Sequence, residues 1–313
     1  MNGARDAGAW GRLMLLGMIW GGSFIAVAVA LRDFGPMTVA FGRIAIAAAA
    51  LTLWALVSGA GLPNPLRPGG GRIWAFAAAL ALLSNAGPFA LLSWGQQHVP
   101  ASLAAVFMAL LPLVVLPLSH FFLPAERLTP RKALGFALGS AGAVILIGPE
   151  TLTSLQGGGA ALMGELACVG VVVLYAMGSI TAKRGPAAEP VGYSALVMLL
   201  AALMIAPAAF LLEAPLAARP ALQGVGALVW LGLLSTALGQ VLLIQVLWRA
   251  GPPFLSQVNF LIPIWAMIFG VTLLGESVAP RTVVALALIF VGVAVAQGLI
   301  GRGRALTRAP SPR

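Results

Sequence analysis

Long apolar runs fill most of this chain, and polar residues gather in short breaks between them. A helix that crosses the hydrocarbon core of a bilayer needs roughly 20 mostly apolar residues. The chain contains ten such runs, at residues 13–31, 36–58, 73–97, 102–123, 131–149, 160–182, 190–212, 222–248, 253–274 and 281–300. The pattern therefore predicts an all-α integral membrane protein with ten transmembrane helices.

Composition agrees with this prediction, and the charges give an orientation. Hydrophobic residues make up 60% of the chain and charged residues 8%, whereas charged residues are about a quarter of a soluble domain. With a cytoplasmic N-terminus, fourteen Lys and Arg residues fall in inside segments and three in outside loops, with Arg43 inside a span. This positive-inside bias predicts that both termini are cytoplasmic. The net charge of +10 is then explained by the orientation of the chain in the membrane, and no nucleic-acid partner is expected.

The chain lacks the residues that several classes of protein need. The single cysteine, Cys168, excludes an intrachain disulfide and a cysteine metal cluster. The two histidines, His98 and His120, lie on different spans, and neither an H-E-x-x-H motif nor a phosphate-binding G-x-x-x-x-G-K-[ST] motif occurs. We therefore expect no enzyme activity, no bound metal, no cofactor and no use of ATP by the chain itself.

One short phrase, Glu-x-x-x-Pro-Arg, occurs twice. It begins at Glu126 and again at Glu276, and each copy follows a long apolar run. Pro130 matches Pro280 and Gly142 matches Gly292 at the same offset of 150 residues. The repetition predicts an internal duplication, with one five-helix unit at residues 1–150, a second at 160–301 and a basic cytoplasmic tail at 302–313.

Five helices are an odd number, so the second unit must enter the membrane in the opposite orientation. Loop charge agrees, because Arg127, Arg131 and Lys132 follow Glu126, whereas Arg281 alone follows Glu276. Inverted-topology repeats are a recurrent transporter architecture in which substrate binds near the midplane at the repeat interface.

The residues also resemble a known family. The opening LLGMIWGGSFIAV at 15–27, the basic residue Arg43 and the paired Glu-x-x-x-Pro phrases are similar to the EamA family of the drug/metabolite transporter superfamily, over residues 12–300. The resemblance implies a ten-helix carrier of the bacterial-type inner membrane that moves small organic metabolites outward, often amino acids or related compounds. The second copy departs at 174–180, where LYAMGSI replaces IWGGSF and Tyr175 is a shifted partner of Trp20.

Ionisable groups inside the membrane are the first site candidates, because insertion costs roughly 2.5–3.5 kcal/mol each. Arg43 either contacts an anionic substrate or forms a structural or gating pair. Glu165, one turn into the sixth span, either neutralises Arg43, binds a substrate amine or a coupling proton, or remains a hydrated carboxylate at the rim. Glu126 and Glu276 are interpreted as helix caps, because each precedes a helix with proline in its first turn.

Amides inside the spans form a second group of candidates. A buried amide needs a partner, and the membrane offers no water outside a cavity. We expect a central pore lined by Asn85, Gln96, Gln240, Gln245 and Asn259. The alternative is that they bond neighbouring helices, at about 0.6 kcal/mol per pair.

Aromatic and small residues complete the candidate site. Trp20, Trp94 and Trp265 either stack on a substrate or belong to the interfacial belt of tryptophans. Ser23 follows Gly21 and Gly22, which allow close backbone approach, and Ser23 and Tyr175 are included in the predicted substrate site.

The leading function is a secondary transporter that exports small molecules by alternating access. An importer, a nucleotide-sugar antiporter and a non-transporting membrane subunit remain open alternatives. Expected partners are a small-molecule substrate, membrane lipid and a possible coupling proton, in a monomer or homodimer. Gly135 and Gly139 form a G-x-x-x-G pair that either makes a dimer face or packs within one chain.

Overall fold

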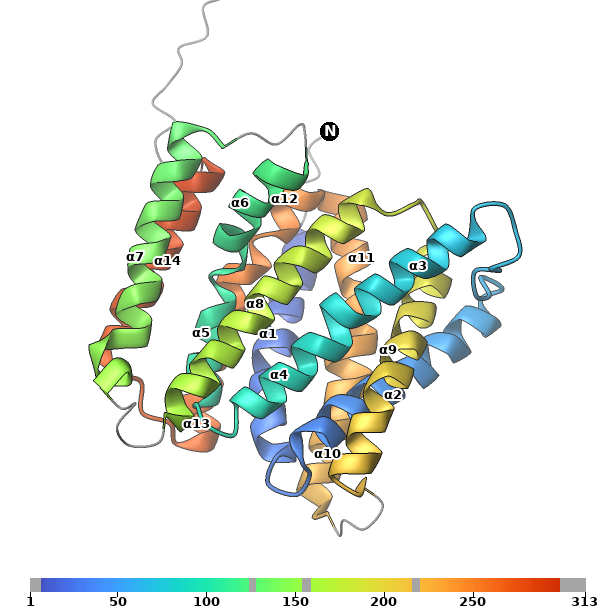
Figure 1. Ribbon diagram of the computed structural model, residues 1–313, viewed down its shortest axis with the longest axis horizontal. Coiled ribbons are helices and arrows are strands. Elements are labelled where there is room, and N and C mark those ends of the chain that lie inside the picture. The colour runs from blue at the N-terminus through green and yellow to red at the C-terminus, as the bar shows by residue number, and fades with distance from the viewer. Residues whose placement is uncertain (1–6, 124–127, 154–158, 216–219, 299–313) are drawn as a thin grey trace, which may run out of the picture.

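The computed structural model describes residues 7–123, 128–153, 159–215 and 220–298, and every regular element within these ranges is helical (Figure 1). The first half contains α1 (Ala7–Ala30), α2 (Pro36–Val57), α3 (Gly70–Ala81), η2 (Leu82–Ala86), α4 (Gly87–Gly95), α5 (Ala101–Met108), α6 (Leu111–Phe122) and α7 (Pro130–Thr153). The second half contains α8 (Ala160–Arg184), α9 (Pro190–Leu212), α10 (Leu222–Val229), η5 (Trp230–Leu238), α11 (Gly239–Ala250), α12 (Pro252–Leu255), α13 (Val258–Leu274) and α14 (Pro280–Gln297).

Each predicted span coincides with one helix or with consecutive helices in series. Within the described ranges, eight segments are long and apolar enough to cross a membrane, judged by length and composition. The ninth, α13, is apolar but shorter, and α7 is the tenth. The all-helical prediction is confirmed for the described residues. Whether all ten segments cross the bilayer remains a prediction.

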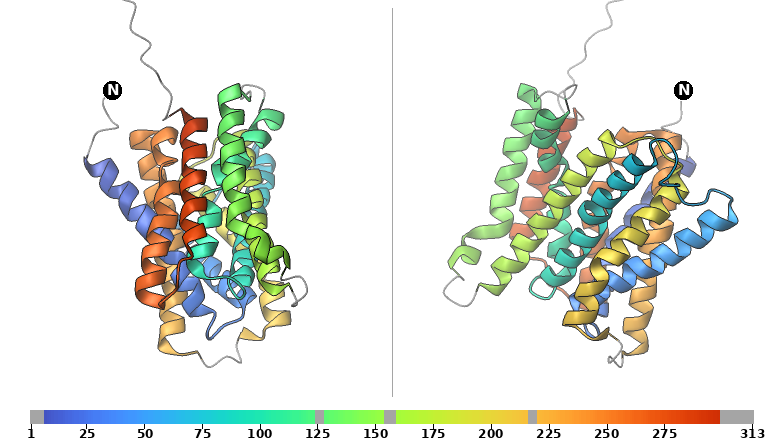
Figure 2. Two further views of the ribbon diagram at one scale, coloured as in Figure 1. Left: turned by 90° about the vertical axis from the view of Figure 1, so that its left-hand side faces the viewer. Right: turned by 45° about the vertical axis from the view of Figure 1, so that its right-hand side comes forward.

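The first residues of α1 and the last of α14 lie at the same end of the bundle (Figure 1). We call this the terminal end and the opposite one the far end. The α8 to α9 connection lies at the terminal end, and the α1 to α2 connection lies at the far end (Figures 1 and 2). Each feature of the site can therefore be placed along the bundle axis.

Several contacts between the two halves come in matched pairs. Helix α7 packs along α14, and α2 packs along α9 (Figures 1 and 2). The contact of α1 with α13 has a counterpart in α8 with α6, and that of α2 with η5 has one in α9 with α3. These contacts thus pair with one another when the halves are exchanged.

The α7 and α14 backbones touch through glycines. A methyl group added at Gly292 would lie 2.6 Å from the Gly139 nitrogen and 2.7 Å from the Gly135 carbonyl oxygen. A methyl group at Gly142 would lie 2.8 Å from an Ile289 side-chain carbon. The G-x-x-x-G pair of the fifth span therefore packs within the chain, which was one of its two interpretations.

Glu276 caps a helix, but not the helix that the sequence suggested. Its carboxylate accepts hydrogen bonds from the backbone N–H groups of Ala101 at 2.7 Å and Ser102 at 3.0 Å. These groups belong to the first turn of α5, in the other half of the chain, and not to α14, which follows Glu276 directly. Its counterpart Glu126 lies outside the described residues.

A second carboxylate makes the same kind of long-range cap. Glu213, at the end of α9, accepts from Met37 N–H at 2.9 Å and Thr38 N–H at 2.7 Å, in the first turn of α2. The first N–H groups of a helix have no partner within the helix, and a negative charge there is favourable. Both caps join the two halves at the far end.

Candidate functional site

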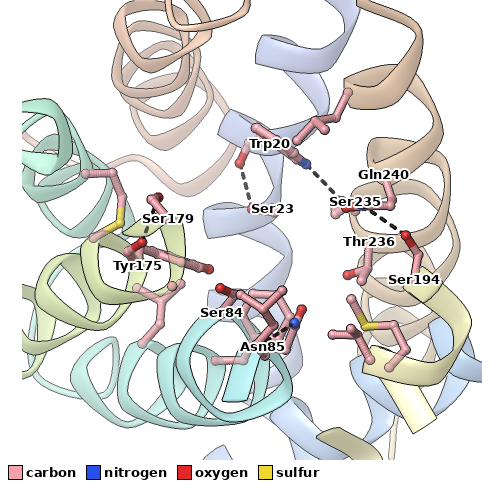
Figure 3. Close-up of a pocket in the computed structure, with 18 of the residues that line it drawn as sticks. Trp20, Ser23, Ser84, Asn85, Tyr175, Ser179, Ser194, Ser235, Thr236 and Gln240 are labelled. Carbon is pink, nitrogen blue, oxygen red and sulfur yellow. Dashed lines mark hydrogen bonds between the residues drawn. The ribbon is translucent and has the colours of Figure 1, made fainter. Parts of the chain in front are cut away.

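A cavity of about 440 Å³ lies in the middle of the bundle (Figure 3). Its walls come from both halves of the chain, including α1, α2, η2 and α4 from the first and α8, α9, η5, α11 and α13 from the second. Seven of the predicted site residues line it: Trp20, Ser23, Arg43, Asn85, Tyr175, Gln240 and Asn259. The structure thus brings together candidates that are far apart in sequence.

The cavity reaches from the middle of the bundle to its terminal end. Its lining includes Ala182 in the last turn of α8 and Tyr193 in the first turn of α9. Arg43, in the second turn of α2, lies toward the far end. The cavity lining therefore extends from Arg43 toward the terminal end of the bundle.

Arg43 is held in a fixed orientation. Its side chain is only 6% exposed, and its Nε donates a hydrogen bond of 2.8 Å to Thr236 Oγ1. Its guanidinium carbon lies 3.8 Å from the centroid of the Phe89 ring, a cation–π contact. Thr236 comes from η5 in the other half, so this bond joins the two halves at the cavity wall.

Two π-helical segments supply polar groups to the cavity. In η2, Ser84 and Asn85 line it, and Asn85 Nδ2 donates to the Leu80 carbonyl five residues back at 3.3 Å (Figure 3). A π-helical turn widens the helix and is frequent at functional sites. Gly178 on the facing α8 has no side chain, which leaves room for the Ser84 hydroxyl.

The second π-helical segment repeats this arrangement. In η5, Ser235 and Thr236 line the cavity (Figure 3). Thr236 Oγ1 donates to the Leu231 carbonyl five residues back at 2.9 Å. Ser235 and Thr236 follow Ser84 and Asn85 by 151 residues, close to the offset of the glutamate phrases. The two segments therefore place the same kind of group on facing walls.

Trp20 closes one side of the cavity. Its Nε1 donates to the Ser235 carbonyl at 3.0 Å, and its own carbonyl accepts from Ser23 Oγ at 2.6 Å (Figure 3). The neighbouring Gly21 faces α13 instead, where a methyl group would lie 2.6 Å from Trp265 Cβ. The Trp-Gly-Gly-Ser stretch thus lines the cavity on one face and packs tightly on the other.

Two amides complete the polar lining. Gln240 Nε2 donates to Ser194 Oγ at 3.3 Å, which links α11 to α9 (Figure 3). Asn259 Nδ2 donates to the Ser256 carbonyl at 3.1 Å. Each keeps an amide oxygen that can accept a hydrogen bond, because these bonds use only the donor side.

Tyr175 and Ser179 come from α8 and face the cavity in Figure 3. Ser179 Oγ donates to the Tyr175 carbonyl at 2.8 Å. The aromatic ring provides apolar surface, and the phenol provides a polar end.

Two other candidates from the amide group lie elsewhere. Gln245 Oε1 accepts from Arg12 Nε at 3.2 Å at an exposed position. Five residues along an α-helix turn through about 140°, so Gln245 cannot share the face of Gln240. Gln96 follows the end of α4 as its C-cap residue and is buried away from the cavity.

The remaining aromatic candidates pack on other residues outside the cavity lining. Trp94 contacts His98 edge to face, with ring centroids 4.9 Å apart. Trp265 stacks on Phe269 at 5.5 Å.

Glu165 lines a separate cavity of about 350 Å³ at the far end. His98 and Arg281 also line this second cavity. Glu165 and Arg43 therefore face different spaces in the described structure.

Sequence reasoning missed several cavity residues, chiefly hydroxyl-bearing ones: Ser84, Ser179, Tyr193, Ser194, Ser235 and Thr236. A signal was present, because Ser84-Asn85 and Ser235-Thr236 are adjacent polar pairs inside apolar runs at nearly the repeat offset.

Comparison with known proteins identifies the family. The EamA-like transporter family matches residues 10–148 and, separately, residues 162–297. The chain belongs to the EamA-like transporter family. This EamA-like protein is therefore a multi-pass membrane transporter with a small-molecule substrate, and membership of a transporter family argues against an enzyme.

Relatives cover nearly the whole chain. The uncharacterized transporter YoaV of Bacillus subtilis (strain 168) is 26% identical over 277 residues, which are 88% of this chain and 92% of the relative. The uncharacterized inner membrane transporter YedA of Escherichia coli (strain K12) is 27% identical over 288 residues, 91% and 89% of the two chains. A solved crystal structure of a protein has the same fold, with a TM-score of 0.65 and 22% identity over 93% of this chain and 98% of the other.

A more specific name comes from a partial match. The probable terminal-alkyne amino-acid exporter of Streptantibioticus cattleyicolor is 28% identical over 134 residues, which are 43% of each chain.

Proposed function

We propose that this protein is a secondary transporter of the inner membrane that exports small organic metabolites by alternating access. In this proposal all ten segments cross the bilayer, residues 1–150 and 160–301 form two inverted five-helix repeats, and both termini are cytoplasmic. The substrate occupies the central cavity.

The observation that carries the proposal is the position of the cavity. It lies between the halves and takes its polar groups from both, including Asn85 of η2 and Thr236 of η5. Binding at the interface of two repeats allows one part to rock against the other around a fixed site.

The cavity is closed toward the far end. Val27, Ala30, Val39 and Leu231 form a buried apolar cluster between α1, α2 and η5, and Glu213 joins α9 to the start of α2 at that end. The positive-inside bias supports a cytoplasmic terminal end. The structure would then be the inward-facing state, in which an exporter takes up its cargo.

Two further findings support the inverted repeat. Several contacts between the halves come in matched pairs, and the family matches the chain twice, at residues 10–148 and 162–297. The partial likeness to an amino-acid exporter supports outward movement of a small organic molecule.

A counterflow assay on purified protein in liposomes tests the transport function. Vesicles preloaded with amino acids, nucleosides, sugars or organic acids are diluted into the labelled compound. We expect counterflow of at least one compound. Absence of counterflow with every compound would contradict the proposal and favour a non-transporting membrane subunit.

Two matched tryptophan variants tie transport to the cavity. Ser179→Trp fills the cavity and should abolish counterflow, whereas Leu211→Trp, at a position that is 83% exposed, should retain it. Equal activity of both would place the transport path elsewhere. Fluxes in intact cells, measured with a reporter of the substrate concentration inside the cell, distinguish an exporter from an importer or antiporter.

A fusion reporter tests the orientation. A reporter at either terminus should give a cytoplasmic signal. A periplasmic signal from either end would rule out the ten-span arrangement with both termini inside.

A further inference from the structure

We propose that the central cavity selects organic monoanions, that the guanidinium of Arg43 binds their oxyanion group, and that the membrane potential drives their export without a coupled proton. This inference rests on the proposed transport function. It adds the charge class of the cargo and the energy source.

The charge balance of the cavity is the first argument. Among the lining residues that the structure describes, Arg43 alone carries a charge, and the others are apolar or neutral polar. A cation or the ammonium of a zwitterion would meet no carboxylate there. A dianion would bring two negative charges to one positive group. A monoanion leaves the loaded cavity neutral, which is the favourable state in a low-dielectric surrounding.

The geometry of Arg43 is the second argument. Thr236 Oγ1 accepts from Nε, and the Phe89 ring covers one face of the guanidinium. Within the described chain, this side chain makes no other hydrogen bond and no ion pair. The two Nη groups therefore keep their N–H donors, in the fork geometry that binds carboxylate or sulfonate oxygens in pairs.

Nearby carboxylates do not neutralise Arg43. On α9, which packs along α2, Glu189 accepts from the N–H groups of Val191 and Gly192 at the start of that helix. At the other end, Glu213 accepts from the first turn of α2. Both carboxylates therefore accept hydrogen bonds from the N-termini of helices. Glu165 lines the separate far-end cavity.

The rest of the cavity fits an apolar body. Phe24, Leu92, Met198, Leu243 and Ile262 contribute apolar surface to the lining. An elongated molecule with an aromatic or aliphatic body and one anionic head would place its body among these side chains and its head at Arg43.

Charge movement follows from this balance. Export of a monoanion moves one negative charge out of a cell that is negative inside, so the membrane potential favours it. None of the described lining residues is a carboxylate or an imidazole that could carry a proton through the cycle. A proton gradient is therefore not needed to drive the cargo outward.

The test uses four compounds that share a benzyl body and differ in the head group. Benzylsulfonate is a monoanion, benzylphosphonate carries up to two negative charges, benzyltrimethylammonium is a cation, and phenylalanine is a zwitterion. Proteoliposomes with a tenfold potassium gradient and valinomycin set the potential. Benzylsulfonate should accumulate about tenfold on the positive side, because one charge crosses per molecule, and a pH gradient should add nothing.

The same assay can overturn the inference while the transport function stands. Preferred transport of phenylalanine or of the cation, or benzylsulfonate accumulation only with a pH gradient, would contradict it. So would counterflow of other solutes without movement of benzylsulfonate. A failure of counterflow with every solute would instead contradict the transport function itself.

Arginine variants test the residue. Arg43→Gln should lower benzylsulfonate transport at least tenfold, and Arg43→Lys, which keeps the charge but loses the fork, should give an intermediate rate. Arg72→Gln is the matched control, because Arg72 also lies over a phenylalanine ring, Phe76, but outside the cavity. Unchanged transport in a folded Arg43→Gln protein would overturn the role of Arg43. The accumulation of benzylsulfonate by the wild-type protein under a membrane potential does not depend on the folding of any variant.

Discussion

Asn85 and Thr236 make the same local bond 151 residues apart. Each lies in a π-helical segment, and each side chain donates to the carbonyl five residues back, Leu80 for Asn85 and Leu231 for Thr236. Both side chains line the central cavity. The two cavity walls thus carry the same local bond at nearly the offset that separates the glutamate phrases.

Thr236→Val should reduce transport more than it reduces stability. The change keeps the shape of the side chain but removes the acceptor for Arg43 Nε and the donor to Leu231. Loss of such a bond costs about 0.5–1.5 kcal/mol, while the released guanidinium leaves its fixed orientation. Initial transport rates and thermal unfolding in detergent measure the two effects.

Thr272→Val provides the control. Its hydroxyl also donates to a backbone carbonyl, that of Ile268 at 2.7 Å, but at an exposed position on α13 outside the cavity. We expect little change in transport. Similar losses in both variants would show that the Thr236 effect comes from helix stability alone.

Gln240→Ala and Gln245→Ala should differ in their effect on transport. Gln240 lines the cavity and bonds Ser194, so its loss should lower the transport rate. Gln245 bonds exposed Arg12 and does not line the cavity, so its loss should leave the specific activity near that of the wild type. Membrane abundance, measured on the same preparations, normalises both rates. A larger loss in Gln245→Ala would contradict the position of the site.

The positions of the helices could be predicted because the length of each apolar run can be read directly from the sequence. All ten predicted runs became helices or consecutive helices. The π-helical segments could not be predicted, since η2 and η5 lie inside apolar runs whose hydropathy is the same for either type of helix. The register of the cavity face depends on them, and three of the five predicted amides, Asn85, Gln240 and Asn259, line the cavity.

The hydroxyl residues of the cavity were missed for a physical reason. Ser and Thr satisfy themselves on nearby carbonyls, as Ser179 and Thr236 do, so they are compatible with an apolar run and do not stand out. Amides do stand out in an apolar run, because a buried amide needs a hydrogen-bond partner beyond its own helix turn. Gln245 found its partner at the exposed end of α1 and not in the cavity.

Glu276→Ala should destabilise the protein without changing which compounds it transports. The carboxylate caps α5 through Ala101 and Ser102, and loss of a cap costs about 0.5–2 kcal/mol. Glu276→Gln keeps one acceptor oxygen and should lose less. Thermal unfolding midpoints test the order, with Ser277→Ala, an exposed neighbour, as the control. An altered preference among compounds at unchanged stability would point to a role in transport instead.

Gly292→Ala and Gly226→Ala should change stability in opposite directions. A methyl group at Gly292 would lie 2.6 Å from the Gly139 nitrogen, so α7 and α14 must separate, at about 1–3 kcal/mol for an overpacked site. At Gly226, in α10, nothing lies within 4 Å of the added carbon, and alanine is favoured over glycine in a helix by up to about 1 kcal/mol. Unfolding in detergent measures both changes. Light scattering on the same samples measures the oligomeric state. If Gly292→Ala converted a dimer into a normally folded monomer, the result would contradict packing of Gly139 against Gly292 within one molecule.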